Sequence, residues 1–158
     1  MFACDLRGHW KSTAAIRTRF GGRFLCFRNI ANRLSSVPKT RVVLYQEDDG
    51  TCPFVQWFDD LPAKAQDKCY LRLERLGQMG HELRRPEADF LRDGIHELRI
   101  SLQGAQHRVL YFFHGPAAAV ISHGLVKERV VPPKEIDRAV ERKRRFEANP
   151  SKHTYEED

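Results

Sequence analysis

The sequence lacks a long apolar run and has few cysteines. No stretch approaches the roughly 20 consecutive apolar residues that a membrane span needs, and no apolar segment follows the N-terminal charges as it would in a secretory signal. Its four cysteines form no C-x-x-C pair. This usage argues against a zinc ribbon and suits a reducing compartment. We therefore expect a cytoplasmic protein with no membrane association, no metal and no other cofactor.

The length and the distribution of charge limit the fold and the binding surface. A chain of 158 residues is long enough for one domain with a real core, and too short for two comfortable ones. The net charge of +6 is uneven, because residues 1–41 carry nine Lys or Arg and one acid. Residues 47–97 have a net charge of −5 and residues 99–145 a net charge of +6. We expect any anion-binding surface of the folded domain to come from its C-terminal half.

Residues 1–41 differ in composition from everything after them. They hold seven arginines, scattered Ser, Thr and Gly, and no strong hydrophobic period. One interpretation is a basic arm for RNA or a transit-like sequence, which is also rich in Arg and poor in acids. The alternative that we favour is a disordered extension or a start-site artefact, with Val42 or Val43 as the true first residue.

Beyond this extension the pattern becomes regular. The run 42–45 predicts a short strand, and Thr51 is expected to cap a helix that has Pro53 in its first turn. Pro62 begins a second helix, which we expect to end at Gly77 and Gly80. The inner stripe of the second helix comprises Ala65, Cys69, Leu73 and Leu76. Residues 81–93 are expected to be a polar connection.

The C-terminal half predicts three strands and a helix. The strands cover residues 95–102, 106–113 and 117–126, and the helix covers 134–148. Residues 149–158 form an acidic tail that we expect to be disordered. The order β-α-α-β-β-β-α predicts an α+β fold, in which helices cover one face of an antiparallel meander. The other face is then available, at least in part, for a ligand.

Charged side chains of these strands suggest a phosphate site. Arg99 lies on the side of its strand opposite to the core residues, and Arg108 is expected to share that face. Two guanidinium groups near Lys127, at the end of the third strand, suit a phosphate. The alternative is that these arginines pair with nearby acids, of which Glu97 is the obvious candidate.

Histidines and the basic C-terminal run have two interpretations each. His123 lies among apolar residues, so it is either a core histidine or a proton shuttle, and Tyr111 is the reserve if His123 is buried. The other strand histidines alternate sides, which argues against a shared metal site. Basic residues near the C-terminus form either a solvated helix face or a contact with the RNA backbone. They are Arg129, Arg142, Lys143, Arg144 and Arg145.

Three consecutive motifs carry a family resemblance. They are G-I-H-E-L-R at 94–99, R-V-L-Y-F-F at 108–113 and I-S-H-G-L-V-K at 121–127, followed by a Pro-flanked helix with Glu135. Over about residues 42–148 the chain resembles the RelE/HigB toxin superfamily of type II toxin–antitoxin systems, and within it the phage-derived HigB-like branch. The resemblance implies a compact microbial-RNase-like fold and metal-free cleavage of mRNA in the ribosomal A site, which inhibits translation. It also implies neutralisation by a helix-turn-helix antitoxin.

The reaction assigns a role to each candidate residue. Attack of a 2′-hydroxyl on the adjacent phosphate needs a proton acceptor, a donor for the leaving oxygen and cations for the growing charge. Arg99 and Arg108 are the charge-stabilising pair, Lys127 adds charge or acid help, and His123 or Tyr111 transfers the proton. Two other functions remain open: a ParE-like toxin that binds a topoisomerase without catalysis, and an inactive phage accessory protein that only binds the antitoxin.

Overall fold

The computed structural model describes residues 40–126 and 130–156. The strands are β1 (Arg41–Leu44), β2 (Ala88–Arg92), β3 (Ile95–Leu102), β4 (Ala105–His114) and β5 (Ala118–Val126). The helices are α1 (Pro53–Asp59), α2 (Ala63–Met79), the 3-10 helix η2 (Gly80–Glu82) and α3 (Pro133–Ala148). Among the described residues no helix is long and apolar enough to cross a membrane.

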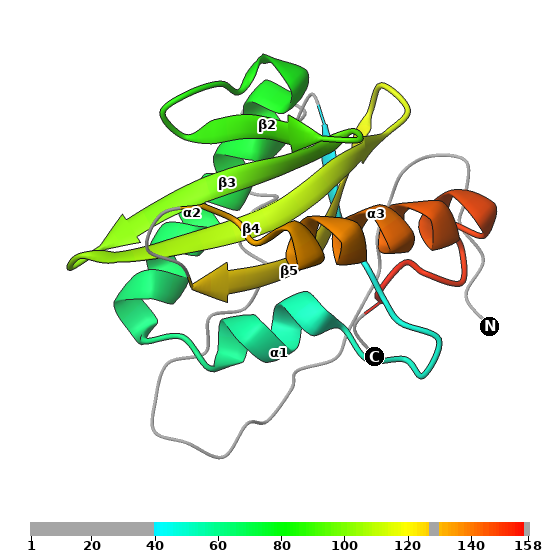
Figure 1. Ribbon diagram of the computed structural model, residues 1–158, viewed down its shortest axis with the longest axis horizontal. Coiled ribbons are helices and arrows are strands. Elements are labelled where there is room, and N and C mark those ends of the chain that lie inside the picture. Colours follow the sequence, from blue (N-terminus) through cyan, green and yellow to red (C-terminus); the bar gives the residue numbers. More distant parts are fainter. Residues whose placement is uncertain (1–39, 127–129, 157–158) are drawn as a thin grey trace, which may run out of the picture. The chain divides into compact units, whose positions relative to one another are not determined.

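The five strands form one mixed sheet in the order β1-β5-β4-β3-β2. Strands β2 to β5 run antiparallel as a meander, and β1 lies parallel to β5 at the edge. Figure 1 shows β3 and β4 crossing the middle of the sheet as its longest hairpin. The predicted α+β class and meander are confirmed, with the addition of one strand.

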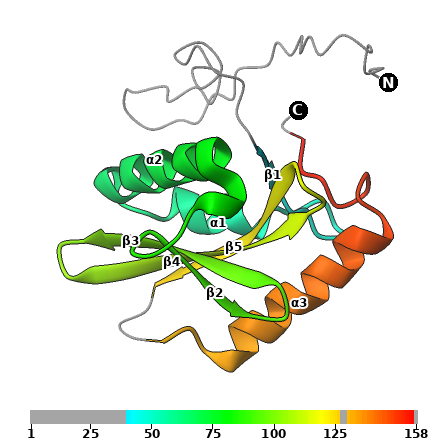
Figure 2. The ribbon, with the colours of Figure 1, turned by 90° about the horizontal axis from the view of Figure 1, so that it is seen from above.

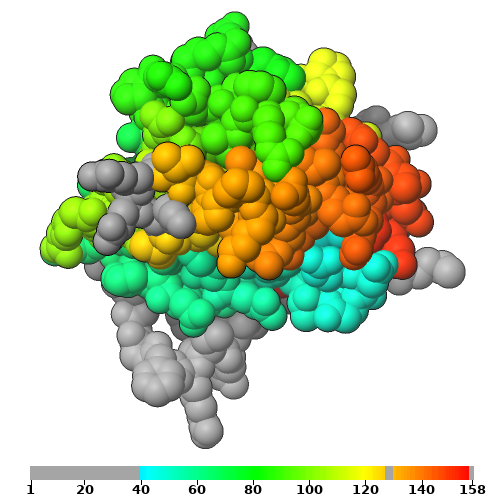
Figure 3. Space-filling view, in the orientation of Figure 1, coloured from blue at the N-terminus to red at the C-terminus, as the bar shows by residue number. Residues whose placement is uncertain are grey.

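Helices cover both faces of the sheet, which separates two apolar cores (Figure 2). On one face, α1 and α2 contribute Phe54 and Leu73 to a cluster with Leu98 and Tyr111. On the other face, α3 packs against a second cluster. The members of that second cluster are Val43, Tyr45, Ile95, Leu110, Phe112, Val120, Val131, Ile136, Ala139 and Phe146. Figure 3 shows α3 lying across this face, so α3 covers part of the face that was expected to be available for a ligand.

The first two helices begin and end close to the expected positions. All four residues of the predicted inner stripe of α2 are buried. The prediction for Thr51 is wrong: Cys52 is the N-cap of α1, while the Thr51 hydroxyl donates to Asp49. Gly77 lies inside α2, and the helix ends at Gly80, whose φ is +51°. A Cβ at Gly80 would also collide with the Thr40 hydroxyl, so glycine satisfies both backbone and packing there.

Strand β2 lies where the sequence predicted a polar connection. Its Ala88 pairs with Leu98 of β3 and is buried, but its register shifts between Phe90 and Arg92. The segment follows Pro86 and has no alternation of apolar and polar residues. This edge strand therefore forms because it pairs with β3, and the local sequence pattern does not encode that pairing.

Hydrogen bonds to other elements hold both ends of the described chain. The Thr40 side chain is buried, and its N–H donates to the Gly77 carbonyl. At the other end, the Gln46 and Tyr155 N–H groups bond the His153 and Leu44 carbonyls, respectively, along β1. The expectation of a disordered tail is thus wrong for residues 149–156. Most of the predicted extension, residues 1–39, lies outside the described residues.

Candidate phosphate-binding site

Two arginines that the sequence placed on one face lie directly opposite each other in the β3–β4 ladder. Arg99 pairs with Arg108, and both side chains project to the face that α3 partly covers. Between them lies Glu97, which is only 4% exposed. Its carboxylate accepts from Arg99 Nε at 2.7 Å and lies 3.2 Å from Arg108 Nε. One buried carboxylate therefore holds both guanidinium groups.

A second acid from the edge strand completes this ion-pair network. Asp89 accepts from Arg99 Nη2 at 2.8 Å and from Arg85 Nε at 2.8 Å. These cations hold the pKa of Asp89 below its ordinary value, with the Arg85 hydrogen bond as the largest cause. The alternative that strand arginines pair with nearby acids is therefore observed. A phosphate would have to share these guanidinium groups with carboxylates, or take them over.

The end of the sheet beyond α3 leaves the arginine pair partly accessible. The Arg99 side chain is 31% exposed and the Arg108 side chain 10% exposed. Next along the hairpin, the Ser101 hydroxyl donates to Gln106 Oε1 at 2.6 Å, and Arg108 Nη1 lies 3.4 Å from the same oxygen. Polar groups thus continue from the arginine pair to the open end of β3.

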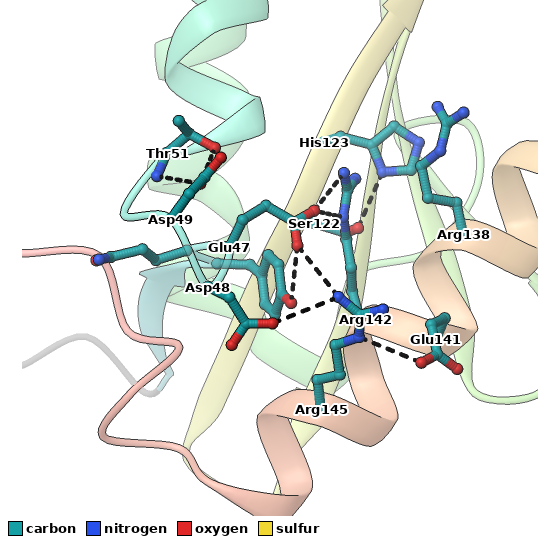
Figure 4. Close-up of polar contacts among 12 residues, drawn as sticks. Glu47, Asp48, Asp49, Thr51, Ser122, His123, Arg138, Glu141, Arg142 and Arg145 are labelled. Carbon is teal, nitrogen blue, oxygen red and sulfur yellow. Dashed lines mark hydrogen bonds and ion pairs between the residues drawn. The ribbon is translucent and has the colours of Figure 1, made fainter.

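His123 shares this face but is enclosed by protein. It pairs with Leu110, one diagonal step from Arg108, and is 5% exposed. Its Nδ1 lies 2.9 Å from the Ser122 hydroxyl, and its Nε2 lies 3.2 Å from a Glu135 carboxylate oxygen at the start of α3. Figure 4 shows His123 between β5 and α3.

Burial determines the protonation of His123. Desolvation, with smaller effects from Arg142 and Arg138, lowers the pKa of His123 to about 3. The imidazole is therefore neutral near pH 7 and a weak base. Enclosed between Ser122 and Glu135, it connects β5 to the first turn of α3.

Tyr111 does not join the arginine pair. Tyr111 faces the α1–α2 side of the sheet, is 1% exposed, and stacks on His96 with ring centroids 5.2 Å apart. Burial raises the pKa of Tyr111 to about 12. The structure therefore does not bring Tyr111 to the site, although the sequence named it as the reserve for His123. Lys127 and Arg129 lie outside the described residues.

The basic run of α3 is largely engaged in contacts within the protein. Arg142 donates to Glu47 at 2.7 Å, lies over the Tyr45 ring, and has a side chain only 11% exposed. Arg145 lies within 3.6 Å of Glu47 and donates to Glu141. Figure 4 shows this network between α3 and the turn after β1. The expectation that the whole run faces outward is wrong for Arg142.

Lys143 and Arg144 make fewer contacts within the protein than Arg142 and Arg145. Lys143 donates to the Asp93 carbonyl at 3.1 Å, whereas the Arg144 side chain is 75% exposed. Of the four residues on α3, Arg144 is the best placed to meet an RNA backbone.

Sequence reasoning missed several polar residues that the fold brings to the arginine pair. Glu97 was considered only as the alternative partner, and Asp89 and Gln106 were not considered. The sequence is sufficient to place Glu97 beside Arg99, because both residues alternate with Leu98 and therefore lie on the same face of the strand. Asp89 could not, since its position depends on the unexpected strand β2. Among the described residues no group of three or more His, Cys, Asp or Glu could hold a metal ion.

Comparison with known protein families gives a match. A family model described as phage derived protein Gp49-like matches residues 56–144, which is more than half of the chain. The match includes α2, the meander and most of α3, and with them the whole candidate site. No curated protein matches the chain.

Proposed function

The chain belongs to the Gp49-like family of phage-derived proteins, and we propose that it is the toxin of a type II toxin–antitoxin pair that cleaves mRNA on the ribosome. The sequence resemblance to the RelE/HigB superfamily covers about residues 42–148 and includes the family match at residues 56–144. The proposed partners are translating ribosomes with their mRNA and a helix-turn-helix antitoxin.

One observation carries the proposal: Arg99 lies directly opposite Arg108 on the face against which α3 packs, and the Arg99 side chain is 31% exposed there. Like charges placed directly opposite each other destabilise a sheet. A pair of guanidinium groups, by contrast, grips a phosphate through parallel hydrogen bonds and stays ionised through the reaction. In the free protein Glu97 offsets this repulsion, and a phosphate in the transition state would offset it in the same way.

The described site supplies charge stabilisation more directly than proton transfer. In the proposed reaction the two guanidinium groups contact the scissile phosphate and stabilise the negative charge that grows on its oxygens. Glu97 orients both groups until the phosphate arrives. Since His123 is neutral but enclosed, we assign it a structural role. We propose Lys127 as the residue that helps to protonate the leaving oxygen.

The experiment that tests the proposal is induction of the protein in a bacterial host, followed by mapping of mRNA 5′ ends. We expect arrest of growth and new ends confined to translated regions. Pre-treatment with an inhibitor that empties ribosomes of mRNA should abolish the new ends. If the wild-type protein arrests growth without new mRNA ends, the nuclease proposal fails.

A second function is favoured by the carboxylates at the site. Glu97 and Asp89 already neutralise much of the charge of Arg99, as expected of a protein that binds a partner without catalysis. Such a chain is either a ParE-like toxin or an inactive protein that binds only the antitoxin. Growth arrest with supercoiling defects and intact mRNA would indicate the first, and no arrest the second.

The proposed antitoxin gives a separate test. A partner that silences an RNA-binding face must cover cations, and the exposed Arg144 and Arg138 side chains lie on one helix. We expect a complex with the product of an adjacent reading frame that survives gel filtration. Its association rate should fall as salt concentration rises, because electrostatic attraction accelerates the encounter.

A further inference from the structure

A cavity of about 410 Å³ opens at the edge of β3, beside the arginine pair. Ligand sites in proteins usually have volumes of about 300–1,000 Å³. The cavity is lined by α2, by the segment before β2 and by the β3–β4 hairpin. Its lining residues are Lys68, Leu71, Arg72, Pro86, Arg99, Ile100, Ser101 and Gln106.

The cavity exists because β2 is shorter than β3. Pairing between these strands ends at Ala88 and Leu98, and the Arg99 N–H bonds the Glu87 carbonyl just before β2. Beyond that point no described strand pairs with the outer edge of β3. Figure 1 shows the β3–β4 hairpin continuing past β2, with α2 behind it.

Cations line this cavity, and no acid is among its lining residues. Lys68 Nζ donates to the Ser101 carbonyl at 3.0 Å, which uses one of its three hydrogens. Arg72 is held by Glu87, a carboxylate that also binds Arg75. Among the described residues no carboxylate pairs with Lys68, so its charge is the least neutralised of the three cations that line the cavity.

Apolar surface lies next to these cations. The Leu71 side chain is 60% exposed although it is a large hydrophobic group. With Pro86 and Ile100 it gives the cavity an apolar side. An inorganic anion would gain nothing from this side, whereas a nucleotide presents a flat apolar base together with its phosphate.

The cavity connects to the proposed reacting groups. Arg99 belongs to both, and Ser101 bonds Gln106, which in turn lies beside Arg108. An RNA strand whose scissile phosphate contacts the arginine pair can thus continue around the edge of β3 towards α2.

We infer that this cavity is a nucleotide subsite, which holds the base and phosphate of the RNA residue next to the scissile bond. Lys68 binds the neighbouring phosphate, and Leu71 packs against the base. The inference rests on the proposed nuclease function, since it names the position of the substrate strand at that site.

The test compares cleavage of ribosome-bound mRNA by Lys68→Ala, Leu71→Ala and the control Lys64→Ala. Lys64 is one turn earlier on α2, is exposed and does not line the cavity. We expect Lys68→Ala to lower kcat/KM about tenfold and to flatten its salt dependence, because one phosphate contact is lost. Leu71→Ala should change base preference at one fixed position beside the cut, as read by sequencing the ends. Lys64→Ala should match the wild type.

The outcomes separate the subsite from the nuclease function. If the wild type cleaves, and both cavity variants cleave with its rate and base preference, the subsite is wrong and the nuclease function stands. A uniform loss with unchanged preference in both variants would indicate contact with ribosomal RNA and overturn the subsite. Normal cleavage with weakened antitoxin binding would identify a protein contact instead. If the wild type does not cleave, the function and the subsite fail together.

Discussion

Arg99 and Arg108 lie directly opposite each other on neighbouring strands, and the buried carboxylate of Glu97 contacts both. Repulsion between opposed guanidinium groups disfavours the sheet, and Glu97 offsets it. A bound phosphate would supply the same kind of negative charge to the two guanidinium groups as Glu97 does. Stability of the free protein and affinity for RNA are therefore expected to oppose each other at this site.

Replacing Glu97 with glutamine should destabilise the fold and strengthen RNA binding. The change leaves a nearly buried Arg108 without its carboxylate, which we expect to cost about 2 kcal/mol; this is below the usual range for a fully buried pair because Arg99 is a third exposed and keeps Asp89. Urea unfolding measures the free energy, and fluorescence anisotropy with a 2′-O-methyl RNA oligonucleotide measures the affinity.

Asp137→Asn is the matched control for this substitution. Asp137 also pairs with an arginine, Arg92, but its side chain is 65% exposed. An exposed pair is worth about 0–1 kcal/mol, so this variant should unfold close to the wild type. If both substitutions lower the free energy of unfolding by the same amount, the buried ion pairs of Glu97 contribute no more to stability than the exposed pair of Asp137.

Arg108→Ala should abolish toxicity while the protein still folds. Loss of one charge-stabilising group typically lowers a rate by about 10²–10³, and Glu97 keeps Arg99 as a partner after the change. Growth after induction and cleavage on translating ribosomes report the activity, with co-purification of the antitoxin as the folding check. Arg144→Ala, on an exposed part of α3, should lower cleavage much less. If the Arg108→Ala variant cleaves at the wild-type rate, the arginine pair does not take part in the mechanism.

His123 should make the protein less stable in acid. The unfolded imidazole binds a proton below its ordinary pKa of 6.5, but the folded one does so only near 3. The unfolded state therefore holds more protons in this window, and stability falls as pH falls from 6.5 towards 3, by about 1.4 kcal/mol per pH unit for one group. Urea unfolding at several pH values from 6.5 down to about 5 measures the slope.

His123→Gln should reduce that slope. Burial also lowers the pKa of His96 and of His107, and both contribute to the slope in either protein. The difference between the two slopes therefore isolates His123. Identical slopes would show that His123 is accessible to protons in the folded state, and would restore it as a candidate proton shuttle.

Removal of the first 41 residues should weaken the domain, although the sequence suggested Val42 or Val43 as its first residue. The Thr40 N–H donates to the Gly77 carbonyl at 3.0 Å, and the Arg41 N–H donates to the Ala117 carbonyl at 2.7 Å. Loss of both bonds should cost about 2 kcal/mol, or roughly 5–10 °C in Tm. A chain that begins at Ser36 keeps both bonds and should melt like the full chain. Equal Tm values for the two truncated chains would show that Thr40 contributes nothing.

Local pattern determined most of the secondary structure. The alternation of Leu98 and Ile100 with Arg99 settled both the strand and the face of Arg99, because side chains along a strand alternate strictly. The stripe of α2 followed in the same way from helical periodicity. Arg108 could be assigned to the face of Arg99 because Val109 and Tyr111 were expected to face the core, which puts Arg108 on the opposite side of its strand.

Tertiary structure decided everything that depends on partners distant in sequence. Strand β2 forms because the edge of β3 needs hydrogen bonds, and it brings Asp89 to Arg99 and leaves the cavity beside Ser101. Burial under α3 lowers the pKa of His123 and favours the core histidine over the proton shuttle, two alternatives that its apolar neighbours in sequence left open.

The same holds for the basic run and the tail. Arg142 lies 95 residues from its partner Glu47, and His153 stacks on Tyr45 across the first strand. The sequence by itself determined which residues carry charge and on which face of each element they lie. Only the packing of the elements determined which charges remain for a ligand, because neutralisation by an ion pair depends on distance in space.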